Sequence, residues 1–150
     1  MTTDSQTIFA DLHRTISKVV SIRLFTVSKL DRKARLSRRV YTSHPVEYPV
    51  TGTKPMNVDD WSKLVIDGKQ TFVANRTADF APYFGDHALI NSLGCQSAVN
   101  IPVTEDGQVV ATVNLLDVED HFTPDRVAML KALVARHTPD ILAALRTANV

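Results

Sequence analysis

The 150-residue chain is poor in cysteine and glycine, and it has no long apolar run. Its one cysteine, Cys95, cannot form a disulfide within the chain, so nothing in the predicted fold requires an oxidising compartment. Crossing a bilayer takes about 20 consecutive apolar residues, and the sequence has no such segment. The first residues also lack the basic start and apolar core of an export signal. We therefore expect a cytoplasmic protein with no membrane partner.

Several signals of catalytic and cofactor sites are also missing. The five glycines are scattered as single turn residues, which argues against a glycine-rich loop around phosphate. The five histidines do not have the spacing that places two metal ligands on one helix, so we expect no metal site. No pair of catalytic carboxylates can be identified either. We therefore assign no catalytic residue and no cofactor, and the sequence favours a binding protein over an enzyme.

Charge is distributed unevenly, although the net charge is only +1. Residues 1–40 contain nine lysines and arginines against three acids, a balance of +6, and the rest of the chain contains eight against 13, a balance of −5. A basic half can be a nucleic-acid surface, or a solvated helix and hairpin that face water or an acidic partner. No aromatic residue is interleaved among the basic residues of 32–39, so we favour the second interpretation and expect no nucleic-acid partner.

Both ends of the chain are predicted to be helical, and a hairpin follows the first helix. Apolar residues recur three and four apart over residues 8–19, which is typical of an amphipathic helix. Residues 22–30 and 36–42 are rich in β-forming side chains, and a polar connection joins them as two strands. Residues 123–125 read Thr-Pro-Asp, a strong helix start, and residues 138–140 repeat it. We expect either a kink or a new helix at the repeat.

The middle of the chain begins with a proline-rich segment, residues 43–58. Three prolines and a glycine exclude a helix there and argue against a central strand. A structureless segment of this length is often a lid or a binding loop. It still contains the apolar residues Val46, Tyr48, Val50 and Met56. They indicate that the segment packs against the body as an ordered cover. A helix over residues 59–68, a strand over 71–74 and one or two short helices over 79–93 are predicted to follow.

Two further strands flank a turn at residues 104–107, and a slip of their register by one residue would exchange the faces. A three-residue loop, Glu105 to Gly107 with Gly107 left-handed, sorts polar from apolar side chains better than a two-residue loop. One face then carries Val99, Ile101, Val103, Val109, Ala111, Val113 and Leu115. The other carries Ala98, Asn100, Pro102, Val110, Thr112, Asn114 and Leu116. We expect the terminal helices on the apolar face and the middle segments on the other.

This order of elements resembles the GAF family, and several local sequences share the likeness. They are LFTV at residues 24–27, LGCQSAVNIPV at 93–103, residues 107–116 with their Asn-Leu-Leu, and FTPD at 122–125. Residues 39–45, 48–49 and 54–56 look like a bacterial stand-alone subgroup. The resemblance spans residues 8–145 and implies one GAF-like domain over residues 1–150. The implied fold is α+β and PAS/profilin-like, with a mostly antiparallel sheet of five to six strands. Terminal helices would cover one face, and a long loop and short helices the other.

The resemblance also implies a role. Members of the family are sensory modules that commonly bind a small molecule between the sheet and the middle segments, here residues 43–96, or dimerise through terminal helices. Since no second domain is predicted in the 150 residues, any signal would pass to a separate output protein. Two hypotheses stay open: a small-molecule sensor as the leading one, and a homodimeric interaction module with a vestigial pocket as the alternative.

Better-defined subgroups of the family fit this sequence poorly. Cyclic-nucleotide-binding members carry lysine after an asparagine, whereas Asn114 is followed by Leu115. Bilin-binding members place histidine after the anchoring cysteine, whereas Gln96 follows Cys95. The free methionine sulfoxide reductases need several cysteines, because one cannot both attack and resolve. The sequence therefore leaves the ligand unidentified.

Polar side chains of the predicted hairpin are the main candidates for ligand recognition: Asn100, Thr112 and Asn114. Buried amides need partners, and either a ligand or the backbone of the cover would supply them. Aromatic residues of the segments expected over that face are candidate walls: Tyr41, Tyr48 and Trp61.

Cys95 and His87 complete the candidate site. A nucleophilic thiol needs a nearby base or cation, which the fold would have to supply through His87. A lone cysteine among apolar residues is by default a buried structural thiol. A thiol-dependent enzyme is therefore a third and less favoured hypothesis.

Overall fold

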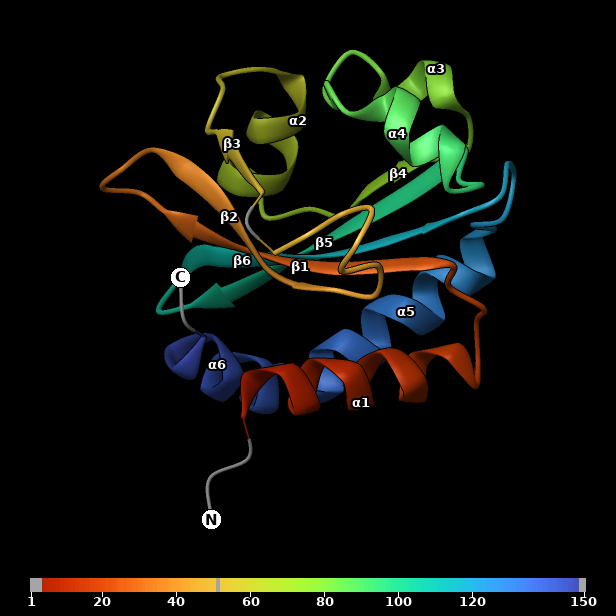
Figure 1. Cartoon of the computed structure of the whole chain (residues 1–150). Helices are drawn as coiled ribbons and strands as arrows, with labels where there is room; N and C mark the ends of the chain where they lie inside the picture. The colour runs from red at the N-terminus through yellow and green to blue at the C-terminus, as the bar shows by residue number, and fades with distance from the viewer. Residues whose placement is uncertain (1–3, 51, 149–150) are drawn as a thin grey trace.

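A six-stranded sheet separates two layers of helix and loop in the computed structural model, which describes residues 4–50 and 52–148 (Figure 1). The strands are β1 (Leu24–Asp31), β2 (Leu36–Thr42), β3 (Thr53–Pro55), β4 (Phe72–Ala74), β5 (Ser97–Glu105) and β6 (Gln108–Asp117). They lie in the order β3-β2-β1-β6-β5-β4, and every neighbouring pair is antiparallel. The predicted α+β architecture is confirmed.

Three helices lie along one face of the sheet: α1 (Ser5–Ser17), α5 (Pro124–Arg136) and α6 (Thr138–Thr147) (Figure 1). The side chain of Asp4 accepts hydrogen bonds from two amides of the first turn of α1, and Thr123 accepts one from the amide of Arg126 at the start of α5. These caps satisfy amides that have no partner inside the helix. At the second Thr-Pro-Asp sequence a new helix begins, which decides between the two predicted outcomes.

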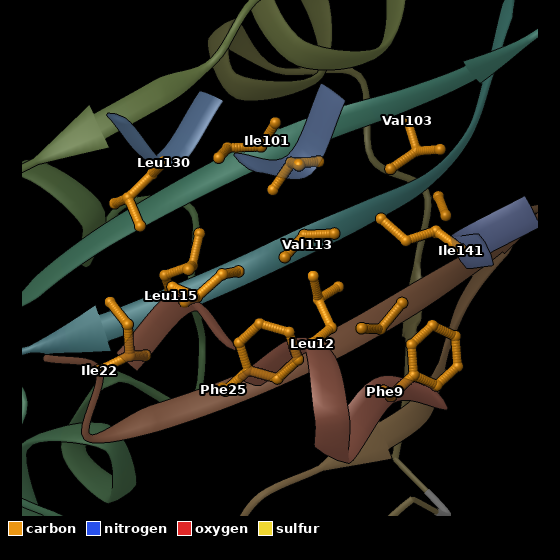
Figure 2. Packing of buried hydrophobic residues seen from close by; sticks show 14 of the residues in the cluster. Phe9, Leu12, Ile22, Phe25, Ile101, Val103, Val113, Leu115, Leu130 and Ile141 are labelled. Atoms are coloured by element: carbon orange, nitrogen blue, oxygen red, sulfur yellow. The ribbon is translucent and has the colours of Figure 1, made fainter. Parts of the chain in front are cut away.

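The main hydrophobic core lies between these helices and the sheet. Figure 2 shows Phe9 and Leu12 of α1 facing Phe25 of β1, beside the β6 residues Val113 and Leu115. Phe9, Phe25, Val113 and Leu115 are fully buried. Each such side chain contributes about 1.5–3 kcal/mol relative to an exposed one. This face of the sheet is therefore filled by the fold itself, as the apolar pattern of β5 and β6 predicts.

The β5–β6 turn differs from the prediction in detail. It is a two-residue turn, in which Asp106 (φ 53°) and Gly107 (φ 79°) are both left-handed, between the paired residues Glu105 and Gln108. An irregularity between Val103 and Thr104 then shifts the register by one residue. A bulge and a third loop residue have the same effect on the alternation of side chains, so the two faces come out nearly as predicted. Val110 is an exception, because it packs against the helix-side core.

The middle of the chain, residues 43–50 and 52–96, lies over the opposite face of the sheet, and we call all of it the cover (Figure 1). Its helical segments are α2 (Asp60–Ser62), the π-helical turn η1 (Lys63–Asp67), α3 (Thr77–Phe80) and α4 (His87–Ser92). The strand β3 joins the edge of the sheet beside β2, where Pro55 is tolerated. Tyr48 is buried, but Val46 is 86% exposed and Val50 39% exposed, so the prediction that both valines pack inward was wrong.

Within the described residues, no helix combines the length and the apolar character needed to cross a membrane.

Candidate functional site

A cavity of about 420 Å³ lies between the sheet and this cover. Its floor is formed by side chains of β1, β5 and β6, and its walls come from residues of the proline-rich segment, α2 and the loop before α4. The rest of the space under the cover is filled by a second buried cluster that includes Phe80, Ile90 and Cys95. The volume falls within the range typical of small-molecule sites. The cover therefore packs tightly on the sheet around Phe80 and Cys95, and leaves a cavity beside Trp61.

A hydrogen-bonded chain of amides crosses the floor of the cavity. Asn100 Nδ2 donates to Asn114 Oδ1 at 2.8 Å, and Trp61 Nε1 donates to Asn100 Oδ1 at 2.9 Å. Asn114 Nδ2 in turn donates to Thr26 Oγ1 and Ser28 Oγ, each at 3.1 Å. The predicted partners of the amides were a ligand or the backbone of the cover. Instead, the sheet and one tryptophan supply partners for both amides, and among the described residues only one amide hydrogen of Asn100 has none.

Thr112 also faces the cavity, as predicted. It is only 3% exposed and lies between Pro102 of β5 and Ser28 of β1 in the ladder. Asn100, Thr112 and Asn114 therefore share one face, which the polar pattern of the two strands predicts. Tyr48 and Trp61 line the same cavity from the cover.

A charged group centred on Asp86 lies at the rim of the cavity. Lys54 Nζ donates to Asp86 Oδ1 at 3.0 Å, and the hydroxyl of Tyr48 donates to Asp86 Oδ2. Arg39 Nη2 lies 4.0 Å from the same carboxylate, and the Arg39 guanidinium carbon lies 3.5 Å from the centre of the Tyr48 ring. Burial acts to raise the pKa of Asp86, but the Lys54 ammonium and the hydrogen bonds outweigh it and leave the pKa below its usual value.

Tyr48 is held in its neutral form at this rim. Burial, and then the negative charge of Asp86, raise the pKa of the Tyr48 hydroxyl far above its usual range. The hydroxyl therefore keeps its proton and donates a hydrogen bond to the carboxylate. No sequence signal connects Arg39, Lys54 and Asp86, because they are distant along the chain and belong to different elements.

Gly52 allows Arg39 to take this position. Its carbonyl accepts a hydrogen bond from the Arg39 amide at 3.0 Å, so the two backbones run side by side. A Cβ on Gly52 would lie only 2.3 Å from Arg39 Nη1. A side chain at this position is incompatible with the present place of the guanidinium. Glycine is needed here for space, since its backbone is not left-handed.

Tyr41 does not form a wall of the cavity, which corrects the sequence-based expectation. Its ring packs against Phe9 and Phe25 on the helix-covered face, at centroid distances of 5.8 and 5.9 Å. The reason is an irregularity in the β1–β2 register between Val27 and Ser28. It places both Val40 and Tyr41 against the helix-side core, whereas a regular strand would send them to opposite faces.

His87 and Cys95 also lie outside the lining of the cavity. His87 begins α4, where its Nδ1 lies 2.8 Å from the carbonyl oxygen of Phe84. Cys95 is completely buried in the second cluster. Burial, with a contribution from the charge of Asp117, raises the pKa of its thiol to about 12, so the thiol stays protonated. Within residues 4–50 and 52–148 there is no group of three or more His, Cys, Asp or Glu side chains arranged for a metal ion.

Comparison with solved structures shows the same fold in several bacterial proteins. The GAF domain of a two-component sensor histidine kinase from Bacillus halodurans has a TM-score of 0.74 at 15% identity, over 95% of this chain and 97% of that one. A GAF domain/HD domain protein from Geobacter sulfurreducens has a TM-score of 0.73 at 15% identity, over 94% of each chain. The second GAF domain of DevS from Mycobacterium smegmatis has a TM-score of 0.67 at 13% identity, over 95% and 96%.

The sequence itself carries the family assignment. A search of curated proteins gave no match. The model of the GAF domain family, however, matches residues 5–137, which include the whole sheet, the cover and α5. With the resemblance of its strands and the agreement of the fold, the chain belongs to the GAF domain family.

Proposed function

We propose that this chain is a sensory module that binds a small molecule in the cavity between the sheet and residues 43–96. The single observation that carries the proposal is the cavity of about 420 Å³, which has a polar floor, aromatic walls and a charged rim. A pocket of this kind, mostly apolar with a few convergent polar groups, is typical of ligand sites. Family membership supports the signalling role, because GAF domains are sensory modules.

Polar recognition falls to side chains that keep hydrogen-bonding capacity. Among the described residues, Asn100 donates one of its two amide hydrogens, to Asn114, which leaves the other for a ligand. The Thr112 hydroxyl faces the cavity as well. Asn114 uses both of its amide hydrogens within the sheet, so its role is to orient Asn100. Trp61 and Tyr48 supply the walls.

The proposed activity is binding and not catalysis. A thiol enzyme would need a thiolate at the surface of the cavity, whereas the Cys95 thiol is buried and its pKa is raised to about 12. The ligand would act on the cover, and a separate output protein would read the change. The outer sides of α1, α5 and α6, on the other side of the sheet from the cavity, would offer a surface to that partner or to a second copy of the chain (Figure 1).

Native mass spectrometry of freshly purified protein tests the proposal. We expect an additional mass that disappears when the protein is denatured, or a rise in melting temperature when a metabolite extract is added. Thr112→Val, which removes only a hydroxyl facing the cavity, should reduce that rise. Lys131→Met on the exposed side of α5 is the control and should leave it unchanged. Protein that carries no compound and responds to no extract would contradict the proposal.

A further inference from the structure

At the rim of the cavity, two cations pair with a single carboxylate. Four charged residues line the cavity: Arg39, Lys54, Asp59 and Asp86. The carboxylate of Asp59 accepts a hydrogen bond from the Ser62 amide at 2.8 Å, as the cap of α2. Among the described residues, this acid forms no ion pair with Arg39 or Lys54. Two cations then remain against the one carboxylate of Asp86.

The two cations also have unused hydrogen-bond donors. An ammonium has three N–H donors and a guanidinium has five. Among the described residues, Lys54 donates to Asp86, and Arg39 donates from its side chain to the carbonyl oxygen of Pro49 at 2.6 Å. The Arg39 side chain is only 10% exposed, so water has little access to its remaining donors. A buried cation of this kind is stabilised by an acceptor that carries negative charge.

The walls near these cations are aromatic. Trp61, Tyr83 and Phe84 all line the cavity. Lys54 Nζ lies 5.1 Å from the centre of the Phe84 ring, so the ammonium and this wall are neighbours. The floor offers few further acceptors, because its amides are bonded to one another and to Trp61. The chemistry of the cavity thus changes from a donor-rich rim to a flat apolar wall within one site.

We propose that the occupant is a small aromatic anion, whose carboxylate or phosphate group binds Arg39 and Lys54 while its ring lies against Trp61 and Phe84. The inference rests on the proposed function, since it concerns the same cavity. Asp86 pairs with both cations in the structure, and the anionic group of the ligand competes with it for Lys54. Binding of the anion would then displace Asp86 from Lys54, and so connect the ligand to the loop before α4.

The experiment uses the full chain and the fluorescence of Trp61, the single tryptophan of the chain. The probes are benzoate, phenyl phosphate and benzamide, with inorganic phosphate to show whether the ring is needed. Benzoate and benzamide have the same shape and differ in charge. We expect at least one of the two aromatic anions to bind about tenfold or more tightly than benzamide, which is the effect of one charge-assisted hydrogen bond. Benzoate against phenyl phosphate distinguishes a carboxylate site from a phosphate site.

Three variants locate the effect at the rim. Lys54→Met should abolish the preference for the anion, and Asp86→Asn should strengthen anion binding because it removes the competing charge. Gly52→Ala should weaken it by displacing the Arg39 guanidinium, the movable end of a long side chain, so the melting temperature should change little. Lys131→Met on α5 is the matched control for charge and should bind all probes as the wild type does.

The possible failures separate the two proposals. If benzamide binds as tightly as the anions, or if Lys54→Met leaves the preference intact, the anionic ligand is wrong and the cavity as a ligand site stands. If the folded protein responds to none of the probes, the anionic ligand is wrong. In that case the ligand-site proposal depends on the native mass spectrum and the metabolite extract.

Discussion

Asn100 and Asn114 lie directly opposite each other in the β5–β6 ladder, and their side-chain amides hydrogen-bond at 2.8 Å under the cavity. The pair connects Trp61 in the cover to Thr26 and Ser28 in the middle of the sheet. The floor of the site and the attachment of α2 to the sheet are therefore one network. A change in the network should therefore alter the free energy of unfolding as well as the affinity for a ligand.

Asn100→Ala tests this coupling. The change leaves the Trp61 indole N–H and an Asn114 oxygen without their partner, so we expect a loss of about 1–3 kcal/mol in the free energy of unfolding. Urea unfolding of the wild type and of Asn100→Ala measures this difference in free energy. Thr112→Val on the same face is the control, and its loss should be clearly smaller. Equal losses would mean that the amide network contributes nothing beyond packing.

The Cys95 thiol should react very slowly with alkylating reagents in the folded protein. Its pKa rises from 9.0 to about 12, which alone lowers the thiolate fraction at neutral pH by about a thousandfold. Complete burial adds a steric barrier. Iodoacetamide labelling followed by mass spectrometry, with and without denaturant, provides the measurement. Rapid labelling of the folded protein would revive the hypothesis of a thiol-dependent enzyme.

Asp86 should make stability depend on pH under acidic conditions. Its pKa is depressed in the folded state, so its contribution is present above the unfolded value of 3.8 and is lost as pH falls through the lower folded value. Unfolding of the wild type and of Asp86→Asn should be compared over this range. We expect the wild type to be the more stable at neutral pH and the difference to shrink as the carboxylate is protonated. A constant difference would contradict the role of the charge.

Gly107→Ala should destabilise the protein through its backbone alone. Gly107 has φ +79°, and the space around it is open, so the added methyl group meets no neighbour. The left-handed conformation costs an alanine about 1–2 kcal/mol. Gly85→Ala is the matched control, since Gly85 also has open space but no positive φ. Thermal unfolding of both variants gives the comparison, and similar melting temperatures would show that the turn relaxes without cost.

The sequence pattern predicted which residues face the cavity where the strands are regular. Alternation along β5 and β6 places Asn100, Thr112 and Asn114 on one face, and the structure agrees. Alternation failed where a strand is interrupted. Tyr41 turned to the helix side and Val110 joined the core, because an extra residue in a strand shifts everything beyond it and leaves no mark in the amino-acid pattern.

What the sequence determined by itself is the architecture: periodicity and capping residues are local properties, and they specify the helices, the strands and the polar face of the hairpin. Only the tertiary structure decided the charged rim, where Arg39 of β2 and Lys54 of β3 meet the carboxylate of Asp86, which lies before α4. The cavity beside this rim depends likewise on how the cover packs on the sheet. Both arise from packing between distant segments, and no local pattern encodes the distance between such segments.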